Sequence, residues 1–447
     1  MIKTQVCIIG AGAGGIGCAY RLIKNGISTV IVDKNSDYGG TMTFGGVDGW
    51  EPGPTLDGLH SLLYEKMLAI ENGCHVVKQV PNCNIFEINN GENWDKHSFK
   101  ERPWGLSLRG DYTYEETLKN ATFGNAKRLQ FEPSALISAV REVFSEHKKH
   151  LVEFFGYRYL SCKHTNDRIS SVTIGNGKRT EEIVADFFVD ATGDIVFARS
   201  AGCSYTIGSE GKDDYGEACA KKSNEINGVS YCFRISKCDD KEHIDSIPEE
   251  YRNVDLGEYE QEKMRKTVSC LVEYPNGDFN INMLPTLEGK EYFALGERAD
   301  IIGKARVWAY WHFWQTEKNM KGYTLTQIYD AGIREGYRLK GRYVLKEQDL
   351  RAGILRQPKI GRTIAIADHA MDIHGECKMF NALDYPYEVP IECTMTNEYS
   401  NLFVSSRGAS FTHIASSSVR LSRTILSIGE GVGEYLTELL FNKNKSE

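Results

Sequence analysis

The 447-residue sequence has no pair of cysteines at CxxC spacing, although it contains 12 cysteines. Such pairs mark zinc sites and iron–sulfur clusters, so the sequence predicts neither. It also lacks an uninterrupted apolar run of about 18 residues, the length that a membrane-spanning helix needs. An excess of positive charge is missing as well, since the formal net charge is −8. We therefore expect no membrane span and no nucleic-acid partner.

The remaining composition is that of an ordinary globular protein. Hydrophobic residues make up 41% and charged residues 26% of the chain, and the length predicts two or three domains. The N-terminus, where Lys3 precedes an apolar run, only weakly imitates a signal peptide. Cleavage there would remove a glycine-rich loop that the next element needs. We expect reduced, mostly buried thiols and a cytoplasmic location.

The glycine-rich loop follows a short apolar run, residues 6–9, that is typical of a buried strand. Gly10, Gly12 and Gly15 have GxGxxG spacing. The first glycine allows a tight turn, the second lets the backbone approach a diphosphate, and the third lets the next helix pack on the strand. We predict that helix over residues 13–25. Its N-terminal N–H groups would bind the diphosphate.

A second β-rich run, residues 28–32, ends at Asp33, 23 positions after Gly10. An acidic residue at this place accepts hydrogen bonds from the hydroxyls of an adenosine ribose. Strand, loop, helix, strand and acid therefore predict a dinucleotide-binding unit. The unit by itself leaves both NAD and FAD as candidates.

Three later motifs favour FAD. A second glycine pair, Gly39 and Gly40, follows Asp33; residues 183–189 form a predicted strand that ends in the ATGD turn at 191–194; and residues 401–436 combine a strand, an arginine-bearing turn and a final helix. In this order they resemble the FAD-dependent oxidoreductases of the glutathione-reductase-like superfamily. The resemblance is closest to a bacterial fumarate-reductase-like group of FAD oxidoreductases.

The closing motif of that group has an arginine, a serine and a histidine in a turn, and then an arginine before the helix. Arg407, Ser410, His413 and Arg420 match these positions. Similarity extends to the segments 332–350, 372–374 and 385–395.

The resemblance implies an α/β fold with a Rossmann-like FAD-binding domain of the glutathione-reductase type. An inserted α+β substrate domain, built on an antiparallel sheet, would cap the flavin. We expect the discontinuous FAD-binding domain at 1–75, 125–205 and 350–445, and the substrate domain at 206–349. The aromatic insertion at 76–124 is a candidate lid, or else a strand pair on the substrate side.

Local patterns add further expectations. Residues 127–148 have helical apolar spacing with a proline near the start, and residues 151–189 read as short strands with a GNGK turn. The runs at 228–236 and 277–285 predict half-exposed antiparallel strands.

We expect FAD to be bound non-covalently, because residues 41–48 lack a histidine or cysteine for a covalent link. The expected cofactor-binding residues lie in the four motifs described above. They are Gly10, Gly12, Ala13, Gly14, Gly15, Asp33, Lys34, Gly40, Thr41, Met42, Ala191, Thr192, Gly193, Asp194, Arg407, Gly408, Val419 and Arg420.

Three residues of the closing motif are the catalytic candidates. His413 is a candidate acid or base because imidazole titrates near neutral pH, with a structural role as the alternative. Arg420 would favour the anionic reduced flavin, together with the N-terminus of the last helix near residues 417–420, or would form a salt bridge. Arg407 would bind the cofactor phosphates or a substrate carboxylate, or would pair structurally.

Two other clusters are interpreted as non-catalytic. His369 and His374 flank Asp372, but their spacing does not place both rings on one helical face, so we expect a structural or pocket-lining pair and no metal. Trp308, Trp311 and Trp314 are three apart, which predicts core packing, with the wall of an aromatic substrate pocket as the alternative.

The leading hypothesis is an FAD-dependent oxidoreductase that transfers a hydride between a small organic substrate and N5 of the flavin. The alternatives are a flavin monooxygenase with an external reductant and a non-catalytic, redox-sensing flavoprotein. A disulfide reductase is not expected without a close cysteine pair. A second NAD(P)H site is not expected without a second GxGxxG after a strand. The sequence predicts neither the substrate nor the electron acceptor nor the oligomeric state.

Overall fold

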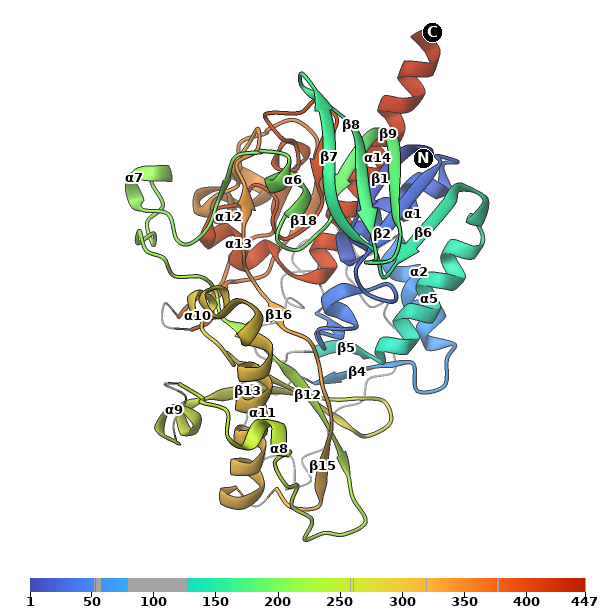
Figure 1. Ribbon diagram of the computed structural model, residues 1–447. Coiled ribbons are helices and arrows are strands. Elements are labelled where there is room, and N and C mark those ends of the chain that lie inside the picture. The colour runs from blue at the N-terminus through green and yellow to red at the C-terminus, as the bar shows by residue number, and fades with distance from the viewer. Residues whose placement is uncertain are drawn as a thin grey trace.

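The computed structural model describes residues 1–51, 53, 58–78, 127–257, 259, 261–318, 320–375 and 378–446. The insertion expected at 76–124 lies outside these ranges except for residues 76–78, so its role as a lid stays a prediction. Within the described chain, two sheets lie at opposite ends of the molecule, and segments that are distant in sequence meet between them (Figure 1).

A seven-stranded sheet forms the centre of the larger lobe. Its order is β6-β2-β1-β9-β8-β7, with β22 pairing with β9 on a separate branch. Parallel pairing joins β6, β2, β1, β9 and β22. In contrast, β8 pairs antiparallel with both β9 and β7. The bounds are β1 Ile2–Ile9, β2 Thr29–Asp33, β6 Leu151–Phe155, β7 Arg158–Thr165, β8 Arg168–Gly175, β9 Thr180–Asp190 and β22 Leu402–Val404.

The strands predicted at 6–9, 28–32 and 183–189 are confirmed as parts of β1, β2 and β9. The predicted GNGK turn is confirmed as the connection between β8 and β9. The central strands are buried on both sides, which explains their continuous apolar runs.

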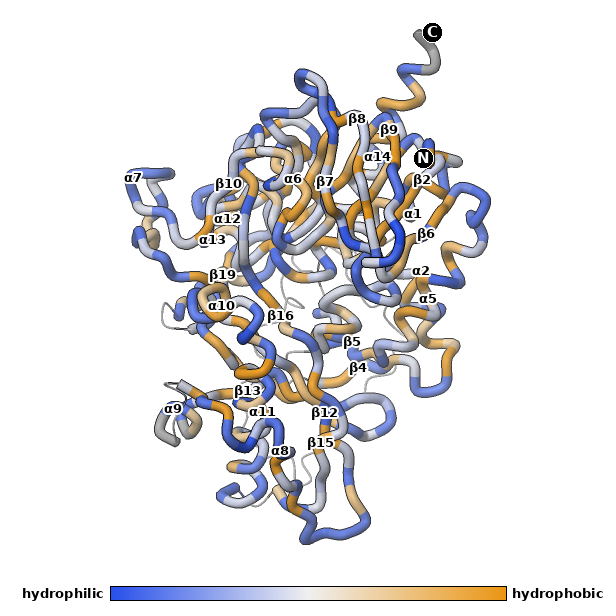
Figure 2. The backbone as a smooth tube through the Cα atoms, viewed as in Figure 1, coloured by the Kyte–Doolittle hydropathy of each residue, from blue (hydrophilic) through white to orange (hydrophobic). Residues whose placement is uncertain are grey.

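Two helices, α1 (Ala13–Lys24) and α14 (Ser422–Ser446), pack against each other beside this sheet. Glycines permit the close approach, because a Cβ atom at Gly429 would lie 2.2 Å from the carbonyl oxygen of Gly14. Helix α1 ends at its C-cap Asn25, and Gly26 then adopts a positive φ of 79°, which is typical of a glycine that follows a helix. Hydrophobic residues gather along β1, β9 and α14, and the C-terminal end of α14 projects from the lobe (Figures 1 and 2).

The helix expected over 127–148 is shorter, and this part of the prediction is wrong. Lys127–Phe131 is strand β5, which pairs with β3 (Gly49–Trp50) and β4 (Cys74–Lys78), and helix α5 covers Pro133–Ser145. Pro133 fixes the helix start, because a proline fits the first helical position and keeps the residue before it extended.

A four-stranded antiparallel sheet forms the second lobe, with the order β13-β14-β12-β15. The bounds are β12 Cys232–Lys237, β13 Val268–Glu273, β14 Phe279–Leu284 and β15 Tyr323–Ile328. Helix α11 (Ala299–Glu317) packs against this sheet. The strands predicted at 228–236 and 277–285 correspond to β12 and β14, but they are mostly buried rather than half-exposed. The helix covers one side, and the cavity described below contacts the other.

Helix α11 carries the tryptophans. Trp311 and Trp314 are buried in the core of the second lobe, and Trp308 packs against that core. This arrangement fits the core-packing interpretation. The second core is separate from the core around the seven-stranded sheet. The domain boundaries given above stay predictions.

Shorter elements connect the lobes and cover the sheet. The helices are α2 Leu59–Leu68, α6 Val196–Ser200, α7 Lys212–Tyr215, α8 Glu249–Arg252, α9 Gln261–Lys266, α10 Gly289–Leu295, α12 Glu347–Arg356 and α13 His413–Val419; the 3₁₀ turns are Gly40–Met42, Lys148–His150, Gly296–Arg298 and Ile391–Cys393. The strands are β10 Tyr205–Thr206, β11 Val229–Ser230, β16 Gly332–Ile333, β17 Arg338–Leu339, β18 Thr363–Ala367, β19 Met371–Ile373, β20 Met379–Asn381 and β21 Tyr387–Pro390. No helix in the described part of the chain combines the length and the apolar character needed to cross a membrane.

Candidate functional site

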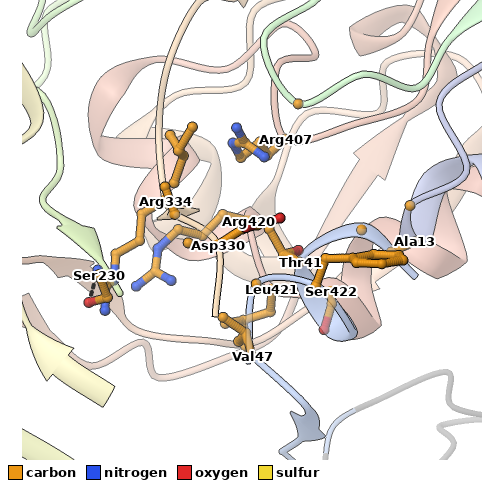
Figure 3. Close-up of a pocket in the computed structure, with 18 of the residues that line it drawn as sticks. Ala13, Thr41, Val47, Ser230, Asp330, Arg334, Arg407, Arg420, Leu421 and Ser422 are labelled. Carbon is orange, nitrogen blue, oxygen red and sulfur yellow. Dashed lines mark hydrogen bonds between the residues drawn. The ribbon is translucent and has the colours of Figure 1, made fainter. Parts of the chain in front are cut away.

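A cavity of about 1490 Å³ runs from the glycine-rich loop to the antiparallel sheet of the second lobe. Pockets of about 300–1,000 Å³ typically hold one small ligand, so this cavity has room for a dinucleotide and a second molecule. Its lining comes from both lobes and from the C-terminal segment. Figure 3 shows part of it, with Ala13 and Thr41 near one end and Ser230 near the other.

The glycine loop is shaped for close backbone contacts. Gly10 has φ +109°, and a Cβ atom there would lie 2.6 Å from the backbone of Ala191. Gly14 and Gly15 are equally crowded, since their Cβ atoms would lie 1.7 Å and 1.9 Å from backbone oxygens. Gly12 differs, because a Cβ atom there would meet nothing within 4 Å. At Gly12 the open space lies in the cavity, where a ligand has room to approach the backbone.

The N-terminus of α1 opens into the same space. Its N-cap is Gly12, it has no side-chain cap, and no acidic residue lies in its first turn. Ala13 and Gly14 line the cavity, whereas Gly15 does not. Uncapped N–H groups and the positive end of the helix dipole are suited to an anion such as a diphosphate.

Asp33 stands at the end of β2 and lines the cavity, as does Lys34. Its Oδ2 accepts a hydrogen bond from the N–H of Ala11 at 2.6 Å, and its Oδ1 accepts one from Asn35 at 2.8 Å. Burial raises the pKa of Asp33, while these two N–H groups act in the opposite direction. The carboxylate is therefore fixed beside the glycine loop, with lone pairs left for a ribose.

The second glycine pair packs under the first loop. The N–H of Gly39 donates to the carbonyl oxygen of Ala11 at 2.9 Å, and a Cβ atom at Gly40 would lie 3.2 Å from Gly12. Gly40 and Thr41 line the cavity, but Met42 is fully buried and does not. Met42 belongs to the hydrophobic core, and its expected contact with the cofactor stays a prediction.

The ATGD turn and Arg407 meet at the cavity wall. All four residues of the turn at 191–194 line the cavity. Arg407 Nη2 donates to Oδ1 of Asp194 at 3.4 Å, and a Cβ atom at Gly193 would lie 2.2 Å from Arg407 Nη1. Arg407 Nε has no hydrogen-bond partner among the described residues. Gly408, next in the chain, does not line the cavity.

Arg420 lies between two helices. The last long helix was expected to begin near residues 417–420, but the chain instead forms α13 and then α14, which starts at Ser422. Arg420 lines the cavity, and Val419 is buried behind it. Arg420 Nη2 donates to Oδ2 of Asp372 at 3.1 Å, and its Nε has no partner among the described residues.

His413 lies at the other end of α13 and does not line the cavity. Its side chain is buried, with Nδ1 2.8 Å from Oε2 of Glu335. Burial lowers the pKa of His413 to about 4, and the charge of Arg338 acts in the same direction. Arg338 itself pairs with Glu335 and Glu210. The structure thus brings Arg407 and Arg420 to the cavity and places His413 in a buried ion-pair cluster.

His374 occupies the cavity wall next to Arg420. Its Nε2 lies 2.8 Å from Oδ2 of Asp372. Burial lowers the pKa of His374 to about 4, and the charge of Arg334 adds to this effect. Burial acts to raise the pKa of Asp372, but the hydrogen bond to His374 and the charge of Arg420 outweigh it and hold the pKa below its usual value. This site therefore pairs a neutral imidazole with an ionised carboxylate near pH 7.

His369 also lines the cavity, with its Nε2 3.7 Å from a carboxylate oxygen of Glu51. Both His369 and His374 therefore line the pocket. Among the residues that the structure describes, no group of three or more His, Cys, Asp or Glu side chains is placed to hold a metal ion.

The rest of the cavity wall contains residues that the sequence patterns did not single out. Arg334 and Arg128 line the cavity, together with Ser230 and Asn282. Figure 3 shows Arg334 reaching Ser230, with Arg420 and Arg407 on neighbouring parts of the wall. No spacing rule links these positions, because they come from separate strands and loops. The available signals were the polar residues inside the strand runs that become β11 and β14, and the resemblance over 332–350, which contains Arg334.

The residues present fit a dinucleotide. The uncapped helix, the open space at Gly12 and the carboxylate of Asp33 offer sites for a diphosphate and a ribose. Together with the parallel sheet, they define a dinucleotide-binding protein with a second chamber beside the nucleotide.

The chain belongs to the FAD-dependent oxidoreductase family, whose model matches residues 5–437. The description of this family names FAD as the cofactor and oxidoreduction as the type of reaction.

Relatives with individual names match only in part. A stretch of 41 residues is 51% identical to the small chain of glutamate synthase (NADPH) from Halomonas elongata and covers 9% of each chain. Another of 92 residues is 35% identical to phytoene desaturase from Fusarium fujikuroi and covers 19% of this chain and 16% of that protein. A solved geranylgeranyl bacteriochlorophyll reductase-like protein from Thermoplasma acidophilum is 12% identical, with a TM-score of 0.46 over 99% of this chain and 80% of that chain.

Proposed function

We propose that the protein transfers a hydride between FAD and a small organic substrate that binds in the half of the cavity nearest to β13 and β14. One observation carries this proposal: a single cavity joins the glycine loop and Asp33 to polar residues of the second lobe, such as Asn282 and Arg334. A non-catalytic flavoprotein has no need for such a chamber beside its cofactor.

The larger lobe would hold the cofactor. The N–H groups at the start of α1 would bind the diphosphate, and Asp33 would accept hydrogen bonds from the ribose. Arg420 would place a positive charge near the pyrimidine end, where negative charge develops on reduction. We propose that this lobe is a glutathione-reductase-type fold, which is supported by the parallel strands and by the β7–β8 excursion between β6 and β9.

When bound, FAD supplies the acceptor or donor of the hydride. The chain must supply a group that takes or gives the accompanying proton. We assign this role to His374, because Asp372 accepts a hydrogen bond from Nε2 and leaves Nδ1 as the unprotonated nitrogen. Its lowered pKa of about 4 keeps that nitrogen free to accept a proton at neutral pH.

The test is anaerobic mixing of the FAD-loaded protein with a panel of small organic acids, alcohols and amines. We expect at least one compound to bleach the visible absorbance of oxidised flavin without any nicotinamide. Bleaching by NADPH or NADH alone, with oxygen then needed for substrate turnover, would instead establish the monooxygenase alternative. Failure of every compound and both nicotinamides to reduce the flavin would favour a non-catalytic flavoprotein.

A further inference from the structure

Arg334 is a buried cation in the cavity wall, and no carboxylate of the described residues pairs with it. It follows β16 and is 9% exposed. Its Nη1 donates to the carbonyl oxygen of Gly228 and to Oγ of Ser230, both at 2.9 Å, and its Nη2 donates to Oδ1 of Asn282 at 3.3 Å. All three acceptors are neutral. No carboxylate oxygen of the described residues lies within 4.0 Å of its nitrogens.

Three other buried arginines of the described residues are paired with carboxylates. Arg306 pairs with Glu291, Arg338 with Glu210 and Glu335, and Arg423 with Asp368. Burial of a charge is costly unless it is paired, so the fold follows this rule at these three positions. Arg334 departs from the rule at the place where its side chain meets a cavity. That combination indicates that the missing anion comes from a ligand.

The nearest acidic groups are already engaged. Asp372 binds His374 and Arg420, and Glu335, next to Arg334 in the chain, binds His413 and Arg338. Burial lowers the pKa of Arg334 to about 10, and the charge of Arg420 acts in the same direction. The charge of Asp372 acts in the opposite direction, but its carboxylate pairs directly with Arg420 and His374 and not with Arg334.

A second arginine adds positive charge to the same chamber. Arg128 on β5 is 8% exposed and lines the cavity, and its Nε has no partner among the described residues. Both arginines act on the thiol of Cys232. Burial and then the charge of Asp48 raise the pKa of Cys232 to about 12, while the charges of Arg334 and Arg128 lower it. Both guanidinium groups thus act on one region of the second lobe.

The geometry of Arg334 matches a planar anion. A guanidinium has five N–H groups, and three of those on Arg334 donate to Gly228, Ser230 and Asn282. Nε donates none among the described residues, so two donors are left, one on Nε and one on Nη2. Two adjacent N–H groups are what a carboxylate accepts in a bidentate pair. The hydrogen bonds to these three neutral acceptors fix the guanidinium in a position to bind a carboxylate.

We propose that Arg334 binds a carboxylate of the substrate, and that Arg128 contributes a second positive charge to the same subsite. This inference rests on the proposed function, because it takes the second half of the cavity as the substrate site. It narrows the substrate class to small organic acids.

The test compares acids with their neutral amides on the FAD-loaded protein. Acetate, succinate and benzoate are titrated against acetamide, succinamide and benzamide, with calorimetry and the flavin absorbance as readouts. The wild type should bind at least one acid about 10-fold or more tighter than its amide. Arg334→Gln should weaken the binding of that acid by about 10- to 100-fold, as expected for a lost charged hydrogen bond. The affinity for the amide should not change. Arg334→Lys should retain part of the affinity.

Arg356→Gln is the matched control, because Arg356 is exposed on α12. Equal affinity of wild type for acids and amides, or unchanged acid binding by Arg334→Gln, would overturn the proposal. Inorganic phosphate that binds as tightly as the acids would overturn the carboxylate assignment. If Arg334→Gln does not fold, the wild-type comparison and Arg334→Lys decide. FAD content is measured separately. A wild type that binds no FAD would contradict the proposed function, but calorimetry would still test whether the cavity prefers anions.

Discussion

Nε2 of His374 lies 2.8 Å from Oδ2 of Asp372, in the wall of the cavity that reaches the glycine loop. The same oxygen accepts a hydrogen bond from Arg420 at 3.1 Å. An ionised carboxylate between an imidazole and a guanidinium fixes both side chains and the tautomer of the histidine. This arrangement links the residue that we assign to proton transfer with the residue expected beside the flavin.

The first prediction concerns His374. His374→Asn should lower turnover by about 100-fold, the usual scale for a lost acid–base group, and leave the FAD content unchanged. Because the pKa of His374 is lowered to about 4, turnover of the wild type should be flat above about pH 5 and fall as the pH approaches 4. A pH–rate profile checks this. His164→Asn, on the exposed strand β7, is the control, and a wild-type transition between pH 6 and 7 would contradict the assignment.

The second prediction separates two glycines of the same loop. Gly12→Ala should fold with an unchanged melting temperature as apoprotein but retain little FAD, because its methyl group enters the open space at the loop. Gly14→Ala should destabilise the fold by about 1–3 kcal/mol, because its Cβ would lie 1.7 Å from the carbonyl oxygen of Ser405. Thermal unfolding and the ratio of FAD to protein distinguish the two. Full FAD retention by Gly12→Ala would place the diphosphate elsewhere.

Local patterns were sufficient for the nucleotide half of the fold. The apolar runs and the glycines at residues 6–33 predicted β1, α1 and β2 because each element is determined by its own residues. The predicted start of the helix at 127–148 is wrong, because the pairing of β5 with β3 and β4 overrides the helical spacing of the apolar residues. The sequence patterns predicted the strands β12 and β14 but did not predict their burial, because the helix α11 that covers them comes from another segment of the chain.

The site was only partly accessible from the sequence. Residues 191–194, Arg407 and Arg420 lie in motifs, and the structure places them on the cavity wall. Arg334 is significant because its acceptors among the described residues are all neutral, and this is a property of the folded molecule that the sequence does not reveal. The location of His413 away from the cavity depends on the direction of α13, which no residue spacing specifies.

The third prediction concerns His413, whose catalytic role stays untested. Its contact with Glu335 favours a positioning role, so His413→Ala should destabilise the protein by about 1–3 kcal/mol, the scale of a lost hydrogen bond to a buried charged group. Turnover of the folded variant should change by less than about 10-fold. Urea unfolding and kcat are measured on the same preparations. A loss of about 100-fold in kcat at unchanged stability and FAD content would restore His413 as an acid–base catalyst.

The fourth prediction concerns Asp48, which is fully buried behind the cavity wall. It accepts hydrogen bonds from Gln130, Asn280 and Tyr274, and burial raises its pKa to about 6. A carboxyl whose pKa is raised in the folded state stabilises the protein at low pH and loses this contribution as the pH rises through 6. Relative to Asp48→Asn, the wild type should lose up to about 3 kcal/mol between pH 4 and pH 8.

Urea unfolding of both proteins across this pH range measures the difference. Asp167→Asn, in an exposed turn, is the control and should show no such trend. A stability gap for Asp48→Asn that is independent of pH would show that Asp48 ionises at its ordinary pKa.

The central claim is that one cavity holds FAD at the glycine loop and an organic acid at the second lobe. A crystal structure of the FAD-loaded protein with the tightest-binding acid tests it most directly. We expect the adenosine ribose at Asp33, the diphosphate at Gly12 and the start of α1, and the carboxylate within hydrogen-bond distance of Arg334. A ribose away from Asp33, or an acid bound outside this cavity, would contradict the account.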